Sequence, residues 1–288
     1  MNGVAGPTAV LLLSCPDQPG VVAATAEFVY RHGGNIVDAQ QHTDGTDGVF
    51  FQRVEFLLEG CDLARDDIEP AFRPIIDRFG MQCAVRFSDD VPRVGILVSK
   101  EAHCLIDLLA RSRRGELAID VPVVISNHRD HAEVADWFDV EYLHLPVTPG
   151  TKPQQERDMQ VVLEAHDVNL VVLARYMQIL SAEFVDAWTD RIINIHHSFL
   201  PAFMGGRPYH QAHERGVKII GVTAHYATAE LDDGPIIDQD VVRVSHRDSV
   251  DDLRRRGRDL EVAVLARAVR AHVEHRILVH GRRTVVFD

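Results

Sequence analysis

The sequence lacks the features that would direct it into a membrane or an oxidising compartment. No apolar stretch among its 288 residues approaches the ~20 needed to cross a bilayer. The first basic side chain is Arg31, so the basic segment of a signal peptide is missing. The cysteines are dispersed and form no C-x-x-C pair: Cys15, Cys61, Cys83 and Cys104. We therefore expect a cytoplasmic protein with reduced thiols and no membrane partner.

Basic charge is also scarce. Lys and Arg number 30 against 43 Asp and Glu, which gives a formal net charge of -13. Nucleic-acid binding normally requires a basic surface, so we expect no nucleic-acid partner. The one dense basic run, 254–258, stands among Asp251, Asp252, Asp259 and Glu261, which is typical of an ion-paired helix face.

Length and patterning predict two α/β domains. The first, residues 8–88, follows the ferredoxin-like order βαββαβ. Its predicted elements are 8–14, 21–32, 36–43, 49–58, 62–79 and 81–87. The charged segment 88–92 contains a proline and predicts the boundary.

The second predicted domain, residues 93–288, alternates continuous apolar strands with helices. Such strands indicate a Rossmann-like, mostly parallel sheet that is covered on both faces. We expect strands at 94–98, 121–126, 141–145 and 169–174, and near the end a long helix over 249–275 and a hairpin. Ligands bind beyond the carboxyl ends of strands in such sheets, so the catalytic groups should lie there.

Two polar clusters in this domain have catalytic chemistry. Asn194 and His196 alternate with isoleucines, so both should face one side of a strand. A hydrogen-bonded histidine that caps the sheet explains this pair equally well. The second cluster, 225–235, includes Asp232 in a turn rich in Asp, Gly and Pro, and an ordinary turn is the alternative there. If the clusters meet, they supply an oxyanion donor, an acid and a base.

A metal site is not expected, although the sequence has 16 histidines. His210 and His213 have helical spacing, and His196 and His197 are adjacent. No Cys or H-E-x-x-H pattern accompanies either pair, whereas a metal needs three or four convergent ligands. We expect no metal.

At these motifs the chain resembles the 10-formyltetrahydrofolate-dependent formyltransferases. The similarity rests on Asn194-Ile195-His196, on Ser198-x-Leu200-Pro201, and on Asp232 seven residues after His225. It covers about two-thirds of the chain and implies that Asn194, His196 and Asp232 are catalytic. The segment 173–180 resembles the folate-binding loop of that family. The resemblance therefore implies the following substrate-binding residues: Arg175, Met177, Gln178, Leu180 and His225.

The first domain resembles ACT domains. The similarity lies in Asp17-Gln18-Pro19-Gly20 before the first helix and in Gly33-Gly34-Asn35-Ile36 after it. It implies a homo-oligomer and an amino-acid effector near Asp17, Gly20 and Asn35. An assembly module that binds no ligand is the alternative, because fold does not determine function.

From end to end the chain resembles the formyltetrahydrofolate deformylases. The turn 98–104 has no glycine to curl around a substrate phosphate, and Glu101 adds a negative charge there. The resemblance implies hydrolysis of 10-formyltetrahydrofolate to formate and tetrahydrofolate, which would supply formate for purine biosynthesis and balance the one-carbon folate pool. It implies no cofactor, because the folate is the substrate. Asp232 would position or deprotonate the water, and Asn194 and a protonated His196 would stabilise the oxyanion.

Two alternatives to hydrolysis follow from the same residues. A formyltransferase would pass the formyl group to a small amine such as glycinamide ribonucleotide. An amino-acid-binding protein without catalysis would use the ACT-like domain alone, but such a protein would not need Asn194, His196 and Asp232 together. A transfer-RNA formyltransferase is less consistent with the acidic residues around 254–258.

Overall fold

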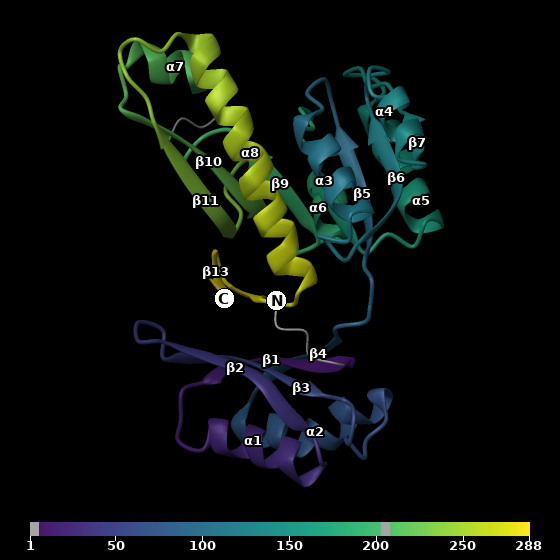
Figure 1. The fold of residues 1–288 in the computed structure, drawn as a ribbon, viewed down its shortest axis with the longest axis vertical. Coiled ribbons are helices and arrows are strands. Elements are labelled where there is room, and N and C mark those ends of the chain that lie inside the picture. The colour runs from purple at the N-terminus through teal and green to yellow at the C-terminus, as the bar shows by residue number, and fades with distance from the viewer. Residues whose placement is uncertain (1–5, 203–207) are drawn as a thin grey trace. The chain divides into compact units, whose positions relative to one another are not determined.

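The computed structural model describes residues 6–202 and 208–288, which form two compact units (Figure 1). The first unit comprises residues 6–91 together with Glu274–His280 and Val285–Asp288. The second comprises the described part of residues 92–273 and Gly281–Thr284. Thus short segments near the end of the chain group with its beginning.

The first unit is a four-stranded sheet of order β2-β3-β1-β4 with every neighbouring pair antiparallel. Helices α1 and α2 lie on one face of this sheet (Figure 1). The elements are β1 (Thr8–Pro16), α1 (Val21–Arg31), β2 (Asn35–Asp44), β3 (Val49–Leu57), α2 (Arg65–Phe79) and β4 (Gln82–Phe87). The predicted βαββαβ order is confirmed.

Alternation in β1 explains how this sheet is buried on both faces. Leu11 and Leu13 belong to the core under the helices. Val10 and Leu12 point the other way and pack with Phe51 and with Phe287 near the end of the chain. Because side chains in a strand alternate between faces, one apolar run supplies both layers.

The second unit contains a seven-stranded sheet, counted over the described residues, of order β11-β10-β9-β8-β5-β6-β7. Five neighbouring strands, β9, β8, β5, β6 and β7, are parallel. Strand β10 pairs antiparallel with β9 on one side and with β11 on the other. The strands are β5 (Arg93–Val98), β6 (Asp120–Ser126), β7 (Glu141–His144), β8 (Leu170–Leu173), β9 (Ile192–His196), β10 (Ile219–Tyr226) and β11 (Ile236–Arg243). The predicted α/β fold with a mostly parallel sheet is confirmed, but β10 and β11 were not predicted from the sequence.

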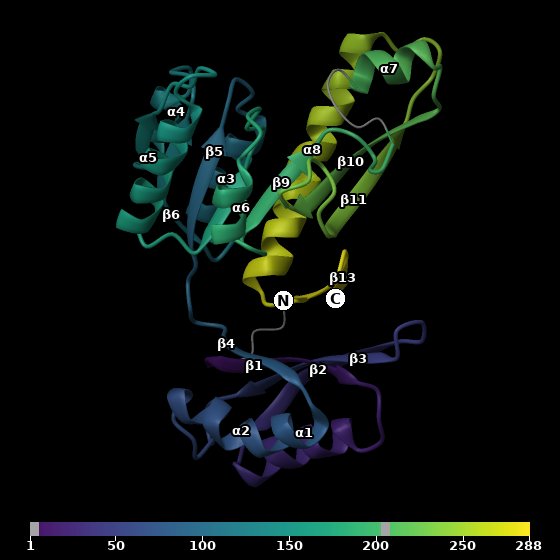
Figure 2. The same ribbon diagram turned by 180° about the vertical axis from the view of Figure 1, so that it is seen from behind.

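Helices cover both faces of this sheet. Met159 and Leu163 of α5 and Phe184 of α6 pack on one face, whereas α8 runs along β9, β10 and β11 and contacts α3 (Figures 1 and 2). The helices are α3 (His103–Arg113), α4 (Ala132–Trp137), α5 (Lys152–Ala165), α6 (Ala182–Ala187), α7 (Pro208–Glu214) and α8 (Val250–Val273). The hairpin predicted after α8 is present as β12 (Ile277–His280) and β13 (Arg283–Val286). Among the described residues, no helix is long and apolar enough to cross a membrane.

Candidate active site

A cavity of about 270 Å³ opens where β8 and β9 end in the second unit. Three segments line most of it: 175–180 after β8, 194–197 at the end of β9, and 227–232 between β10 and β11. Both polar clusters that we identified in the sequence therefore meet at one cavity. The carboxyl ends of the parallel strands meet at this edge, which is where α/β sheets bind ligands.

The register of β9 against β10 places Asn194 opposite His225. Nδ1 of His225 lies 2.9 Å from the carbonyl oxygen of Tyr226, and that oxygen can only accept. Nδ1 therefore carries the proton, and Nε2 of the neutral ring accepts from Nδ2 of Asn194 at 3.1 Å. Burial lowers the pKa of His225, which keeps the ring neutral. His225 thus orients the Asn194 amide and leaves its second N–H for a ligand.

His196 and Asp232 form the second pair of the site. Nδ1 of His196 lies 3.1 Å from Oδ1 of Asp232, and both side chains are almost fully buried. Burial raises the pKa of Asp232, but the hydrogen bond from His196 and the neighbouring histidines outweigh this effect and give a net lowering. Asp232 is therefore ionised at neutral pH and holds the proton of His196 on Nδ1.

Two local features bring Asp232 to His196. Asp232 has φ +55°, a left-handed conformation that Asp tolerates better than most residues. Gly234 follows it, and a Cβ there would lie 1.7 Å from the carbonyl oxygen of Tyr226. Only glycine lets the turn approach β10 so closely, so this turn shapes the catalytic side of the cavity.

Nε2 of His196 is buried and has no hydrogen-bond partner among the described residues. The same side chain lines the cavity. A buried imidazole nitrogen without a partner is costly, so this atom is poised for a group of the substrate. Nδ1 already contacts Asp232, so Nε2 is the ring nitrogen of His196 that is available for proton transfer.

The segment after β9 is tied to β10 by one buried hydroxyl. Oγ1 of Thr223 donates to the carbonyl oxygen of Ser198 at 2.9 Å and accepts from the backbone N–H of Leu200 at 3.1 Å. Ser198 and Leu200 belong to the motif that the sequence analysis identified. Through these two hydrogen bonds they fix the path of the backbone that follows His196.

The predicted folate loop after β8 is held by Ser99. Its hydroxyl accepts from the backbone N–H of Met177 at 2.9 Å, and its own N–H donates to the carbonyl oxygen of Arg175 at 3.2 Å. Met177 is exposed at the rim, Gln178 is half-buried, and Leu180 is buried. All of these loop residues line the cavity, as does His225.

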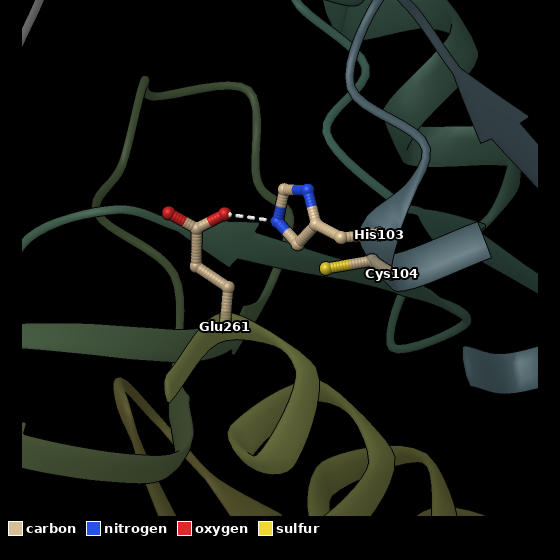
Figure 3. Close-up of side chains that lie close together, drawn as sticks. All are labelled: His103, Cys104 and Glu261. Atoms are coloured by element: carbon tan, nitrogen blue, oxygen red, sulfur yellow. Dashed lines mark hydrogen bonds and ion pairs between the residues drawn. The ribbon is translucent and has the colours of Figure 1, made fainter. Parts of the chain in front are cut away.

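A second polar cluster lies beside the cavity. Its central residue, Glu261, was expected on an ion-paired helix face, but this prediction is wrong because the side chain is buried. Glu261 of α8 is 1% exposed, and one of its oxygens accepts from His103 Nε2 at 2.7 Å (Figure 3). Its other oxygen accepts from the Tyr209 hydroxyl at 2.9 Å. Nε of Arg175 lies 3.3 Å from the same carboxylate. The detectable sequence signal was a lone Glu on the apolar face of the long helix, which is unusual unless the charge is paired.

His103, Cys104 and Glu261 also place one ligand atom each within 4.8 Å of one another (Figure 3). These are three candidate ligands, one of which, the Cys104 thiol, is buried and has its pKa raised well above the ordinary value by that burial. Glu261 is already engaged by hydrogen-bond donors. These donors fit a hydrogen-bonded network better than a metal centre.

The residues predicted to contact an effector lie in the first unit. Asp17, Gly20 and Asn35 are exposed. The backbone N–H of Asp17 donates to Gly48, and Gly20 precedes α1 with φ +98°. Their role in ligand binding stays a prediction.

Known proteins share this two-part organisation. Residues 9–74 match the family described as ACT domain, and residues 92–269 match the family described as Formyl transferase. A protein of Synechocystis sp. named formyltetrahydrofolate deformylase is 55% identical over 280 residues, which cover 97% of this chain and 98% of that protein.

Solved structures give the same result. A formyltetrahydrofolate deformylase from Pseudomonas syringae pv. tomato has a TM-score of 0.97 at 46% identity, and the match covers 100% of this chain and 96% of that one. A glycinamide ribonucleotide transformylase 1 from Symbiobacterium toebii has a TM-score of 0.66 at 37% identity over 70% of this chain and 97% of its own. The transformylase thus matches part of the chain, whereas the deformylases match it from end to end. These findings confirm the resemblance seen in the sequence, and the chain belongs to the formyltetrahydrofolate deformylase family.

Proposed function

We propose that the protein hydrolyses 10-formyltetrahydrofolate to formate and tetrahydrofolate. The observation that carries the proposal is the convergence of Asn194, His196 and Asp232 on one cavity. These groups supply a hydrogen-bond donor, an imidazole with one available nitrogen, and an ionised carboxylate. Addition of water to a formyl group needs these three functions.

In the proposed reaction the pterin lies against the loop 175–180, and the formyl carbon lies between Asn194 and His196. Asp232 positions a water molecule, whose oxygen attacks this carbon. The oxyanion receives hydrogen bonds from the Asn194 amide and from protonated His196 at Nε2. Collapse of the intermediate breaks the C–N10 bond, and N10 takes up the proton that the attacking water gave to Asp232. The second water proton passes to the medium, and formate and tetrahydrofolate are released.

Water, rather than an amine, is the proposed acceptor because of the turn between β5 and α3. In this turn Glu101 forms an ion pair with Arg258 at 2.9 Å, and His103 contacts Glu261 at 2.7 Å. Side chains of this turn thus bind residues of α8, and the turn carries no glycine. The turn therefore offers a substrate phosphate no glycine backbone that could curl around it, which disfavours an acceptor such as glycinamide ribonucleotide.

Formate release from 10-formyltetrahydrofolate, without any added amine, tests this proposal. We expect one formate for each tetrahydrofolate formed, and loss of release in Asp232→Asn. Asp233→Asn is the matched control, because Asp233 lies in the same turn but does not line the cavity. Turnover that begins only when glycinamide ribonucleotide is supplied would instead identify a transferase.

We further propose that the ACT unit binds a free amino acid near Asp17, Gly20 and Asn35 and holds the chain in a homo-oligomer. The match of residues 9–74 to ACT domains supports a ligand-binding role. Strand β2 is an edge strand of its sheet, so its unpaired backbone groups are available to a second copy. A rise in melting temperature with one of a panel of amino acids, and the mass in light scattering, test the two parts separately. No shift with any amino acid would leave an assembly module alone.

For the compartment and the cofactor we propose the cytoplasm and no metal requirement. Four free cysteines, two of them buried, are suited to a reducing compartment. The three catalytic groups supply base, acid and oxyanion donor themselves, and the released formate would serve purine biosynthesis and the one-carbon folate balance. Full turnover after dialysis against a chelator is the expected result.

A further inference from the structure

A second cavity adjoins the active site at the start of the folate loop. It measures about 210 Å³ and has a polar lining that includes Glu101, His103, Tyr209 and Glu261. Arg175 and His197 line both cavities, so these two side chains form the boundary between them. None of the three catalytic residues lines the second cavity, so it needs an explanation of its own.

Arg175 is the unusual member of this boundary. Its side chain is 13% exposed, and its Nε and Nη1 atoms are buried without a hydrogen-bond partner among the described residues. Glu261 balances its charge from 3.3 Å but already accepts hydrogen bonds from His103 and Tyr209. A buried guanidinium with vacant N–H groups is costly, and an oxygen-bearing anion would satisfy it.

The other cations near this cavity are engaged elsewhere. Arg258 contacts Glu101 at 2.9 Å, and Arg254 contacts Asp251 at 2.8 Å. His197 contributes no charge, because burial and the nearby Arg175 lower its pKa to about 3. Arg175 is therefore a cation of this lining whose buried donors have no partner among the described residues.

The reaction itself produces an anion of the right kind. Water adds to the formyl carbon, the C–N10 bond breaks, N10 gains a proton, and formic acid loses its proton to the medium. Formate thus forms beside the ionised Asp232, which repels it. A vacant N–H of the guanidinium can donate a charge-assisted hydrogen bond to a carboxylate oxygen, and the three heavy atoms of formate fit easily into the cavity.

We propose that Arg175 binds the product formate in the second cavity, after it moves away from Asp232 and before it leaves the protein. This inference rests on the proposed hydrolysis. The cavity then holds the small product apart from tetrahydrofolate.

Product inhibition by added sodium formate tests this site, with sodium chloride at equal ionic strength as the control. We expect the inhibition constant for formate to rise at least about tenfold in Arg175→Gln, which corresponds to the loss of one charge-assisted hydrogen bond or more. Arg175→Lys keeps the charge but lacks the planar guanidinium. Its inhibition constant for formate should therefore lie between those of the wild type and Arg175→Gln. Arg255→Gln is the matched control and should keep the wild-type constant, because Arg255 lies on α8 but does not line the cavity.

A direct titration of 13C-labelled formate into the full-length wild-type chain, followed by NMR line broadening, requires neither turnover nor a stable Arg175 variant. Binding that tetrahydrofolate does not displace is expected. Absence of binding to wild type, or an unchanged inhibition constant in folded Arg175→Gln, would overturn the proposal. If wild type binds formate but releases none from 10-formyltetrahydrofolate, the proposed hydrolysis fails while the anion site stands.

Discussion

Replacing Asn194 tests the geometry at the reaction centre most directly. One N–H of its amide is engaged by Nε2 of His225, and the second is free for the formyl oxygen. Loss of one preorganised oxyanion donor costs about 2.7–4 kcal/mol, or roughly 10²–10³ in kcat. We therefore expect Asn194→Ala to lower kcat by that factor. The KM for the folate should change little, because this hydrogen bond forms mainly in the transition state.

His225 should act through Asn194 and not on the substrate directly. His225→Phe keeps a buried ring but removes the acceptor at Nε2, so the amide is free to rotate. One neutral hydrogen bond contributes about 1 kcal/mol, and its loss should lower kcat roughly five- to tenfold. In the Asn194→Ala background the same change should have almost no further effect, because the group that it orients is absent.

Stopped-flow measurement of tetrahydrofolate formation with the two single variants and the double variant completes this cycle. Melting temperatures should accompany each variant, since His225 is buried. Additive losses in kcat would show that His225 contributes independently of Asn194. An unchanged kcat in Asn194→Ala would remove the oxyanion role and refute the reasoning.

Three further predictions concern other parts of the second unit. Asp232→Asn keeps an acceptor for His196 but removes the negative charge. Formate release should therefore fall roughly 10²–10⁴-fold, with little change in melting temperature. Full activity of this variant would contradict a base role for Asp232. Gly257→Ala would place a Cβ 1.9 Å from the Tyr209 hydroxyl, so it should displace that ring from Glu261 and destabilise the protein by about 1–3 kcal/mol in denaturant titrations. Because the pKa of His197 is lowered to about 3, the unfolded chain binds its proton first as pH falls below the ordinary 6.5, and stability is lost from there downward. At pH 5 this loss is at most about 2 kcal/mol, and His197→Gln should reduce the fall in melting temperature.

Local patterning was sufficient to predict most elements and the general position of the site. Alternation and turn residues predicted β1 to β4 with their two helices, because strand period and glycine-terminated helices are properties of short segments. The same alternation placed Asn194 and His196 together, and both line the cavity. The pairing of His196 with Asp232, 36 positions later in the chain, came from resemblance and not from any local pattern.

Strands β10 and β11 were not predicted, because the polar cluster 225–235 interrupts the apolar pattern of that segment. Antiparallel addition of β10 to a parallel sheet is decided by which edge it meets, and this is a contact between distant segments. The orientation of Asn194 depends on that contact, since His225 reaches it only across the β9–β10 register.

By itself, then, the sequence determined the two-unit α/β organisation and the identity of the proposed catalytic groups. Periodicity and residue type are properties of short segments, so they can be recognised from the sequence alone. Only the tertiary structure decided that Arg175 directs its guanidinium toward Glu261, 86 positions away, and leaves two buried donors without partners. Burial, hydrogen-bond direction and charge balance arise when distant segments pack together. They are therefore properties of the folded chain.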